Sequence, residues 1–488
     1  MTILATAPDS LLDSLAARLG AAHVLTEMSD MAGYLVESRG LYRGSAIAVV
    51  RPRDTEEVAF VVRECAAAGC AVMPQGGNTG LVGGGVPYGS LVLSLQRLDR
   101  VREVDPVNAT LTVEAGCTLK SVQDAAEAAD SLFPLSLASE GSCRIGGNLA
   151  TNAGGTAVLR YGNARELVLG LEVVLADGRV WNGLKGLRKD NTGYDLKNLF
   201  VGSEGTLGII TAAVVKLFPR PRARATAFVG MASPADALKV FDRLRKEAGE
   251  ALTAFEYMSR FALDMVLRHA RGAVRPLAGD HASYALIELT SPREDADLQG
   301  VFESVLGAAI EDGLVEDATI GASEAQNRAL WHLREMLSEV QGFEGGSIKH
   351  DVSVPVSRVA EFVEVASAAC EVALPGVRVC PFGHFGDGNI HFNLSQPVGM
   401  DKGAFLAEWD RFNRIVHGIV QAMNGSISAE HGIGLLKRDE LAHYKDPVAL
   451  DLMHRLKAAL DPHNILNPGK VVAVGGDLPA AMPHVPGR

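Results

Sequence analysis

Three glycine-rich segments constrain this chain more than any other feature of its sequence. They cover residues 74–80, 141–155 and 202–208, and the first and third border short apolar runs that are typical of β-strands. Repeated glycines let successive backbone N–H groups converge on an anion such as a pyrophosphate, and they let the backbone approach a flat ligand closely. The spacing matches neither a Rossmann fingerprint nor a P-loop. Ordinary glycine-rich turns are the alternative, but three such loops in one domain favour a large bound cofactor.

Composition and charge narrow the class of protein. A chain of 488 residues exceeds one ordinary core, so we expect two or three domains. The net charge of −12 disfavours a nucleic-acid partner, which needs a basic face. The six cysteines form no CxxC pair, which disfavours an iron–sulfur cluster or a disulfide framework. The sequence shows neither a secretory signal nor an uncharged apolar run of roughly 20 residues, so we expect a cytoplasmic protein without a transmembrane segment.

Helix and strand patterns predict an α+β chain. A boundary falls at Pro219–Arg222, where two prolines interrupt regular structure. Beyond it, strands alternate with helices such as 234–248, which predicts helices packed on a sheet. The expected parts are an N-terminal helical segment at 1–39, a cofactor domain at 40–219, a substrate or cap domain at 224–425, a C-terminal segment returning to the cofactor domain at 426–475, and a tail at 476–488.

A histidine-rich hairpin is the main candidate for a metal site. Asp387-Gly388 predicts a two-residue type I′ turn, which would place His384 directly opposite His391. Opposed side chains have Cβ atoms roughly 5 Å apart, so the two imidazoles can reach one ion, and Asn393 shares their face. Glu430 offers a carboxylate, and two imidazoles with a carboxylate suit Zn²⁺ or a similar divalent ion. The alternative is a pair of stacked histidines and an unrelated glutamate.

Together these motifs resemble a known family. The three glycine loops resemble the FAD-binding domain of vanillyl-alcohol-oxidase-type (PCMH-type) enzymes, and residues 383–393, 430–432 and 464–470 resemble the C-terminal domain of FAD-linked oxidases. The similarity covers about residues 40–470 and is strongest to members that oxidise D-2-hydroxyglutarate, with D-lactate, D-malate and glycolate enzymes as relatives. It implies a two-subdomain FAD-binding domain, a cap domain with an antiparallel sheet, and a C-terminal segment that returns to the flavin.

The resemblance assigns the FAD contacts to the glycine loops and to the C-terminal segment. The first loop would hold the pyrophosphate of a non-covalent FAD, although Cys143 in the second loop leaves attachment through cysteine open. The residues assigned to the cofactor are Pro74, Gln75, Gly76, Gly77, Asn78, Thr79, Gly80, Gly141, Ser142, Ile145, Gly146, Asn148, Thr151, Asn152, Gly154, Gly155, Glu204, Gly205, Ile209 and Asn467.

The resemblance also implies the chemistry of a 2-hydroxy acid dehydrogenase. His384, His391 and Glu430 would hold the metal, and Asn393 would reach the substrate. The metal would bind the hydroxyl and α-carboxylate oxygens, hydride would pass to flavin N5, and His431 would take the hydroxyl proton as general base. A role for His431 as a fourth metal ligand stays open, although adjacent residues on a strand point to opposite sides.

A cationic clasp for a second carboxylate is the basis of the substrate assignment. Arg334, Ser338 and Lys349 match positions that hold the distal carboxylate of 2-hydroxyglutarate, although the family more often has Thr in place of Ser338. Residues 331–338 have a helical pattern that puts Arg334 and Ser338 on one face, and an arginine fork with a lysine suits a carboxylate. A surface arginine paired with a neighbouring glutamate is the alternative.

Partners and other functions follow from what the sequence does not contain. Without a cluster-binding motif, electrons would pass to an external acceptor, either an electron-transfer flavoprotein or a quinone, as in relatives. A homodimer is compatible with the sequence. Two other classes stay open, a zinc hydrolase built on the histidines and a flavin redox carrier without its own substrate. The glycine loops argue against the first, and the metal cluster argues against the second.

Overall fold

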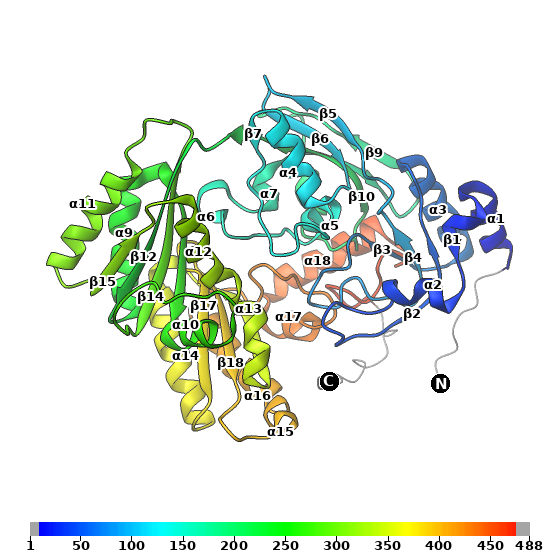
Figure 1. Ribbon diagram of the computed structural model, residues 1–488. Coiled ribbons are helices and arrows are strands. Elements are labelled where there is room, and N and C mark those ends of the chain that lie inside the picture. The colour runs from blue at the N-terminus through cyan, green and yellow to red at the C-terminus, as the bar shows by residue number, and fades with distance from the viewer. Residues whose placement is uncertain (1–8, 475–488) are drawn as a thin grey trace. The chain divides into compact units, whose positions relative to one another are not determined.

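The computed structural model describes residues 9–474 of the chain, which form two compact units (Figure 1). Unit 1 comprises the residues up to 154, residues 163–219 and the residues from 430 on, and unit 2 comprises residues 155–162 and 220–429. The chain therefore passes between the units four times, after residues 154, 162, 219 and 429. The tail expected at 476–488 and the first eight residues of the expected N-terminal segment lie outside the described residues.

Unit 1 contains a four-stranded sheet of order β1-β2-β4-β3, in which β2, β4 and β3 are parallel. The strands are β1 (Val24–Leu25), β2 (Ser45–Val50), β3 (Val72–Gln75) and β4 (Tyr88–Ser94). Helix α3 (Thr55–Ala68) is capped by Asp54, whose side chain accepts the Glu57 N–H, and ends at Gly69 with φ 64°. Its apolar face packs with α1 (Asp9–Leu19) against the strands, which forms the core of this part.

A five-stranded antiparallel sheet of order β5-β6-β10-β8-β9 completes the framework of unit 1. Its strands are β5 (Val101–Asp105), β6 (Thr110–Glu114), β8 (Val168–Val174), β9 (Val180–Gly183) and β10 (Ile209–Lys216). The remaining elements of the unit are α2 (Met28–Met31), α4 (Leu119–Ala128), β7 (Ser131–Leu132), α5 (Ile145–Ala150), α7 (Ala164–Leu167), α8 (Lys197–Phe200), β11 (Phe218–Pro219), α17 (Arg438–Tyr444) and α18 (Pro447–Leu460).

The C-terminal segment returns to the parallel sheet of unit 1. The Val72 N–H donates to Ile465 O, and the Asn467 N–H donates to Val72 O, both at 2.7 Å. This pairing extends the edge of the sheet beside the first residue of β3.

Unit 2 is built on one seven-stranded antiparallel sheet of order β15-β12-β14-β13-β17-β18-β16. Its strands are β12 (Ala223–Met231), β13 (Leu252–Ser259), β14 (Ser283–Ser291), β15 (Asp317–Ile320), β16 (Ser347–Ser353), β17 (Arg378–His384) and β18 (Asn389–Ser395). Its helices are α6 (Val158–Tyr161), α9 (Pro234–Ala248), α10 (Arg260–His269), α11 (Leu298–Glu311), α12 (Glu324–Glu335), α13 (Leu337–Val340), α14 (Val359–Ala373), α15 (Lys402–Leu406) and α16 (Trp409–Ala422).

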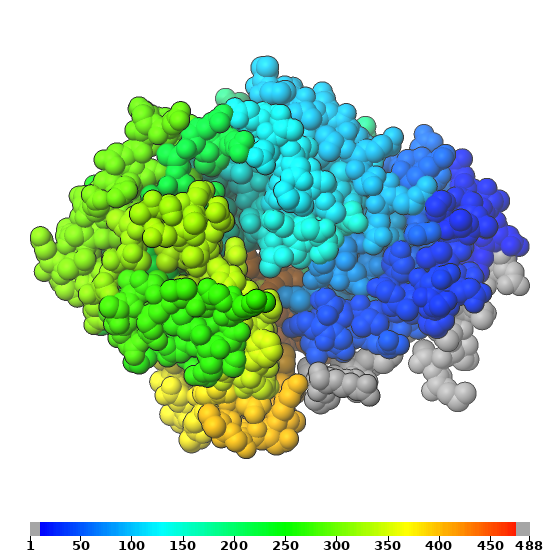
Figure 2. Space-filling view, viewed as in Figure 1, coloured from blue at the N-terminus to red at the C-terminus, as the bar shows by residue number. Residues whose placement is uncertain are grey.

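Helices cover both faces of this sheet. Helices α9, α11 and α14 contact one face, and α10, α12 and α13 pack over the other, where their apolar side chains join Phe228, Leu286 and Phe382 of the strands. Figure 2 shows the green and yellow-green residues of α10 and α12 on the viewer's side of unit 2. The mixed helix-and-sheet class predicted from the sequence is confirmed. Among the described residues, no helix is both long and apolar enough to cross a membrane.

Candidate active site

A cavity in unit 1 is lined by all three glycine loops. The expected cofactor residues on its wall are Pro74, Gln75, Gly76, Gly77, Asn78, Thr79, Gly80, Gly146, Asn148, Thr151, Glu204, Gly205 and Ile209. Those expected but not on the wall are Gly141, Ser142, Ile145, Asn152, Gly154, Gly155 and Asn467. His431 also lines the cavity, which places the expected general base beside the loops.

Close backbone packing explains why glycines are needed around this cavity. A Cβ on Gly77 would clash with Ser142 O, and a Cβ on Gly146 would lie 2.6 Å from the Ala115 Cβ, so these glycines let the loops pack against their neighbours. Asn78 and Glu204 adopt left-handed φ values of 54° and 51°, which bend the first and third loops.

Three buried amide oxygens mark the cavity region as a site for a hydrogen-bond-donating ligand. Gln75 Oε1, Asn148 Oδ1 and Asn467 Oδ1 have no hydrogen-bond partner among the described residues. Asn467 is held in place because its Nδ2 donates to Glu204 O at 2.8 Å and to Gly84 O at 3.1 Å. Buried acceptors without a donor are costly, so these residues fit a ligand such as FAD, which carries N–H and O–H groups along its length.

The histidine hairpin of unit 2 differs from the predicted one in its register. Phe382, not His384, pairs with His391, and four residues separate β17 from β18, so the predicted two-residue turn is wrong. The longer turn lets Phe385 reach the opposite face of the sheet, where its ring stacks on Tyr257 with 4.9 Å between centroids. Because the register shifts by two residues, His384 and His391 still share one face, with ring centroids 5.6 Å apart.

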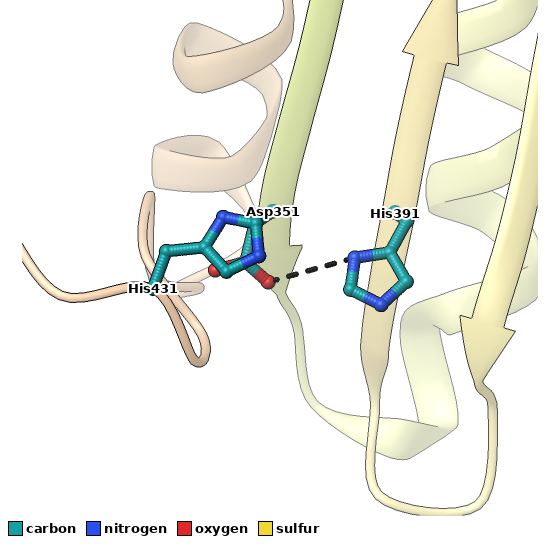
Figure 3. A group of neighbouring side chains, drawn as sticks. All are labelled: Asp351, His391 and His431. Atoms are coloured by element: carbon teal, nitrogen blue, oxygen red, sulfur yellow. Dashed lines mark ion pairs between the residues drawn. The ribbon is translucent and has the colours of Figure 1, made fainter. Parts of the chain in front are cut away.

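A carboxylate lies next to Nδ1 of each histidine, and neither carboxylate was in the predicted site. Glu256 Oε1 accepts a hydrogen bond from His384 Nδ1 at 2.6 Å. Asp351 Oδ1 lies 3.9 Å from His391 Nδ1 (Figure 3), and Asn389 Nδ2 donates to the same oxygen at 3.1 Å. The hydrogen bond to Glu256 favours the tautomer of His384 whose Nε2 lone pair can bind a metal, and the Asp351 carboxylate adds negative charge near His391, so this donor set fits a divalent ion.

Glu430 and His431 belong to unit 1, where their chain segment leaves unit 2. The preceding residues of unit 2 are joined to β16, because Ser353 and Ser426 exchange backbone hydrogen bonds and the Ala429 N–H donates to Asp351 O at 3.3 Å. Within unit 1 the Glu430 carboxylate lies against Gly154, where a Cβ would clash with its Oε1. The chain therefore reaches Glu430 one peptide bond after a residue that is bonded to the backbone of Asp351.

Arg334 is not a surface residue, and its partner is not one of the glutamates next to it in the sequence. It is 7% exposed, its Nε donates to Glu256 Oε2 at 2.6 Å, and its guanidinium carbon lies 5.2 Å from the centroid of the Phe382 ring. Burial raises the pKa of Glu256, but His384 and Arg334 outweigh burial and bring the pKa down to about 2. Glu256 is thus an ionised carboxylate with a partner on each oxygen.

The other expected substrate residues occupy different positions around Arg334. The predicted continuous helix over 331–338 is wrong, because α12 ends at Glu335 and α13 begins at Leu337. The side chain of Leu337 packs in the core, and Ser338 is exposed. Lys349 on β16 pairs directly with Asn393 on β18, so both share the face of His391.

Asn393 carries a buried amide on the sheet face that it shares with His391 and Lys349. Its Nδ2 donates to Gln341 Oε1 at 2.8 Å, whereas its Oδ1 has no hydrogen-bond partner among residues 9–474. The amide is therefore oriented by Gln341 and presents an acceptor that an N–H or O–H group of a ligand can fill.

The residues missed by sequence reasoning are Glu256, Asp351 and Gln341. Glu256 lies in the run Leu252–Ser259, where it is the only charged residue, and a lone carboxylate in an otherwise apolar strand is a usable signal. Which histidine it would meet depends on the pairing of β13 with β17, which are about 120 residues apart in the sequence and which no local pattern predicts.

Sequence families match both units. Residues 220–471 match the family described as FAD linked oxidases, C-terminal domain, and residues 46–183 match the FAD binding domain family. The mitochondrial D-2-hydroxyglutarate dehydrogenase of Bos taurus is 41% identical over 470 residues, which covers 94% of this chain and 83% of the bovine protein. The D-2-hydroxyglutarate dehydrogenase of Xanthomonas citri pv. viticola is 38% identical over 473 residues, which covers 96% of this chain and 98% of that protein.

Solved structures support the fold. The structure of p-cresol methylhydroxylase with substrate bound has a TM-score of 0.76 at 19% identity and covers 96% of this chain and 98% of its own. The 4-ethylphenol oxidase from Gulosibacter chungangensis has a TM-score of 0.71, also at 19% identity, and covers 95% of this chain and 97% of its own. The predicted vanillyl-alcohol-oxidase (PCMH-type) fold is confirmed.

Proposed function

Because this chain belongs to the FAD-linked oxidases and is an FAD-dependent D-2-hydroxyacid dehydrogenase, we propose that it oxidises D-2-hydroxyglutarate to 2-oxoglutarate. One observation carries the choice of substrate. The buried Arg334 shares the carboxylate of Glu256 with His384, so a cation for a distal carboxylate lies beside a histidine suited to a metal. Lactate has no second carboxylate for such a cation to bind.

The cavity assigned to FAD lies in unit 1, whereas His384 and His391 lie in unit 2. When bound, FAD supplies the two-electron acceptor at N5. We assign the divalent metal, Zn²⁺ or a similar ion, to His384, His391 and Glu430, because two imidazoles backed by carboxylates and one further carboxylate suit such an ion. When bound, the metal supplies a Lewis acid that lowers the pKa of a coordinated hydroxyl.

Side chains of the protein carry out proton transfer and substrate binding. His431, on the wall of the FAD cavity, takes the substrate hydroxyl proton as general base. Arg334 offers Nη1 and Nη2, which make no hydrogen bond to the described residues, and Lys349 adds a point charge from β16. Asn393 reaches the substrate with the amide that Gln341 orients.

The reduced flavin passes its electrons to an external acceptor, an electron-transfer flavoprotein or a quinone. All six cysteines are buried and unbridged, and among residues 9–474 none belongs to a group of three or more potential metal ligands, so they do not supply the thiolate set of an iron–sulfur cluster. A cytoplasmic location and a homodimer stay predictions.

Anaerobic reduction of the purified holoenzyme tests the proposed substrate. D-2-Hydroxyglutarate should bleach the visible flavin band at low concentration, whereas D-malate, D-lactate and L-2-hydroxyglutarate should need far higher concentrations or fail. Dithionite serves as the control for complete reduction. Bleaching by D-lactate at the same concentration as by D-2-hydroxyglutarate would exclude the two-carboxylate substrate, and bleaching by none of these acids would exclude the proposed function.

A further inference from the structure

Glu256 is the most enclosed charged group on the histidine-bearing face of unit 2. It is 1% exposed on the central strand β13, between the buried residues Phe255 and Tyr257. Each oxygen of its carboxylate has one partner, His384 Nδ1 on Oε1 and Arg334 Nε on Oε2, both at 2.6 Å. A buried carboxylate is stable only when such partners compensate for lost hydration, so the three residues depend on one another.

Backbone pairing and an aromatic ring fix the geometry of this trio. Glu256 pairs directly with His384 across β13 and β17, so the sheet register sets their separation. Arg334 comes from α12 and lies over Phe382, which is two residues before His384 on the same face of β17. The guanidinium is therefore held by a carboxylate at one nitrogen and by an aromatic face, which restricts its plane.

We propose that Glu256 is a positioning residue that couples the metal ligand His384 to the substrate-binding Arg334. This inference rests on the proposed function. By holding both groups on the two oxygens of one carboxylate, Glu256 fixes the spacing between the metal end and the distal end of the site. The site therefore selects 2-hydroxydicarboxylates of one length. The metal ligand His384 and the specificity residue Arg334 are both held by the carboxylate of Glu256.

The chemistry of an amide shows why one carboxylate is needed. Glutamine at position 256 keeps one acceptor oxygen but turns the other atom into an N–H donor. If the oxygen stays with His384, the new N–H group faces the Arg334 Nε–H, and the guanidinium is displaced. If the oxygen stays with Arg334, the new N–H group faces His384 Nδ1, which favours the tautomer that carries its proton on Nε2 and disfavours metal binding.

The test uses the FAD-loaded full chain and measures metal affinity separately from activity. Glu256→Gln should raise the Zn²⁺ Kd by about 10–100-fold in chelator competition, as expected when the partner of a ligating histidine is lost. It should also raise KM for D-2-hydroxyglutarate by more than it raises KM for D-lactate. Glu288→Gln is the matched control, because Glu288 is a buried carboxylate on the neighbouring strand β14 whose partners are Trp331 and Arg224.

Arg334→Ala provides a second test that does not require Glu256 to be changed. Arg334 is not a proposed metal ligand, yet its loss leaves Glu256 with one partner, so the Zn²⁺ Kd should rise in this variant as well. In Glu256→Gln/Arg334→Ala, measured at saturating Zn²⁺, KM for D-2-hydroxyglutarate should not rise beyond that of Arg334→Ala alone.

The results separate the coupling from the proposed substrate. An Arg334→Ala protein that binds Zn²⁺ as tightly as the wild type overturns the coupling, even if Glu256→Gln cannot be purified. A purified Glu256→Gln protein with unchanged Zn²⁺ Kd and unchanged KM overturns it too. If the metal affinities change as expected but D-2-hydroxyglutarate does not reduce the wild-type flavin, the substrate assignment fails and the coupling between the two residues stands.

Discussion

Two buried glutamates show how the partner of a carboxylate decides its chemistry. Glu256 faces His384 and Arg334, which lower its pKa to about 2. Glu204 accepts the backbone N–H groups of Ile433 and Gly434 at 2.7 and 2.9 Å, and because these neutral donors do not outweigh burial, its pKa rises to about 6. The first carboxylate stays ionised across physiological pH, whereas the second titrates near it.

Lys470 gives unit 1 a pH-dependent stability. It is 2% exposed, its Nζ donates to Val86 O at 2.9 Å and lies over the Tyr88 ring, and Glu204 and Arg438 are its charged neighbours. Burial lowers its pKa from 10.5 to about 7, so between these values the unfolded chain binds a proton that the folded chain does not. The free energy of unfolding therefore rises with pH across this window, by a few kcal/mol at about 1.4 kcal/mol per pKa unit.

Unfolding midpoints of wild type and Lys470→Met, measured from pH 7 to 9.5, check this prediction. The variant should lack the gain in stability that the wild type shows as pH rises, so the difference between the two proteins should change steadily in favour of the wild type. Titrating groups remote from Lys470 cancel in this difference, and Glu204, its carboxylate neighbour, does not. Parallel curves for the two proteins would contradict the lowered pKa of Lys470.

At the scale of elements, two short loops determine the positions of the functional side chains His384 and His431. The loop between β17 and β18 places His384 diagonally from His391 and buries Phe385. The segment after Glu430 depends on glycine, because Gly432 has φ 80° and a Cβ there would lie 2.7 Å from Glu204 Oε1. Glu204 thereby links the third glycine loop to the segment that carries His431.

Gly432→Ala should slow the reaction without removing the cofactor. The added methyl group meets Glu204 Oε1 in a backbone conformation that favours glycine, so the segment must shift and carry His431 with it. A displacement of about 1 Å at a catalytic group can cost about 10²-fold in kcat. Steady-state kinetics and the flavin-to-protein absorbance ratio measure the two effects.

The matched control is Gly418→Ala on α16, where a Cβ meets nothing within 4 Å and the helix gains about 0.5–1 kcal/mol. Its kcat should equal that of the wild type. If Gly432→Ala also keeps the wild-type kcat with full flavin content, the His431 segment does not depend on Glu204.

At the scale of the whole molecule, local patterns predicted the elements and tertiary pairing determined the site. Helix 234–248 was predicted with its observed bounds, because the side chain of Ser233 caps its N-terminus and a proline follows. The hairpin register and the partners of Arg334 were not, since they depend on which distant strands and helices meet. Predicting Glu256 beside His384 would have required knowing that β13 and β17 are neighbours.

Metal removal is the sharpest test of the whole molecule, because two of the three proposed metal ligands lie outside the unit that contains the cofactor cavity. The residues that line the cavity belong to unit 1, whereas His384 and His391 belong to unit 2. Dialysis against a chelator should therefore lower turnover by at least about 100-fold, because polarisation by the metal supplies several kcal/mol, while the visible flavin band keeps its intensity. Adding back Zn²⁺ or another divalent ion should restore turnover in proportion to the bound metal, measured by elemental analysis. Full turnover in protein stripped of metal would show that His384 and His391 serve another role, and loss of flavin together with the metal would show that the two sites are not separable.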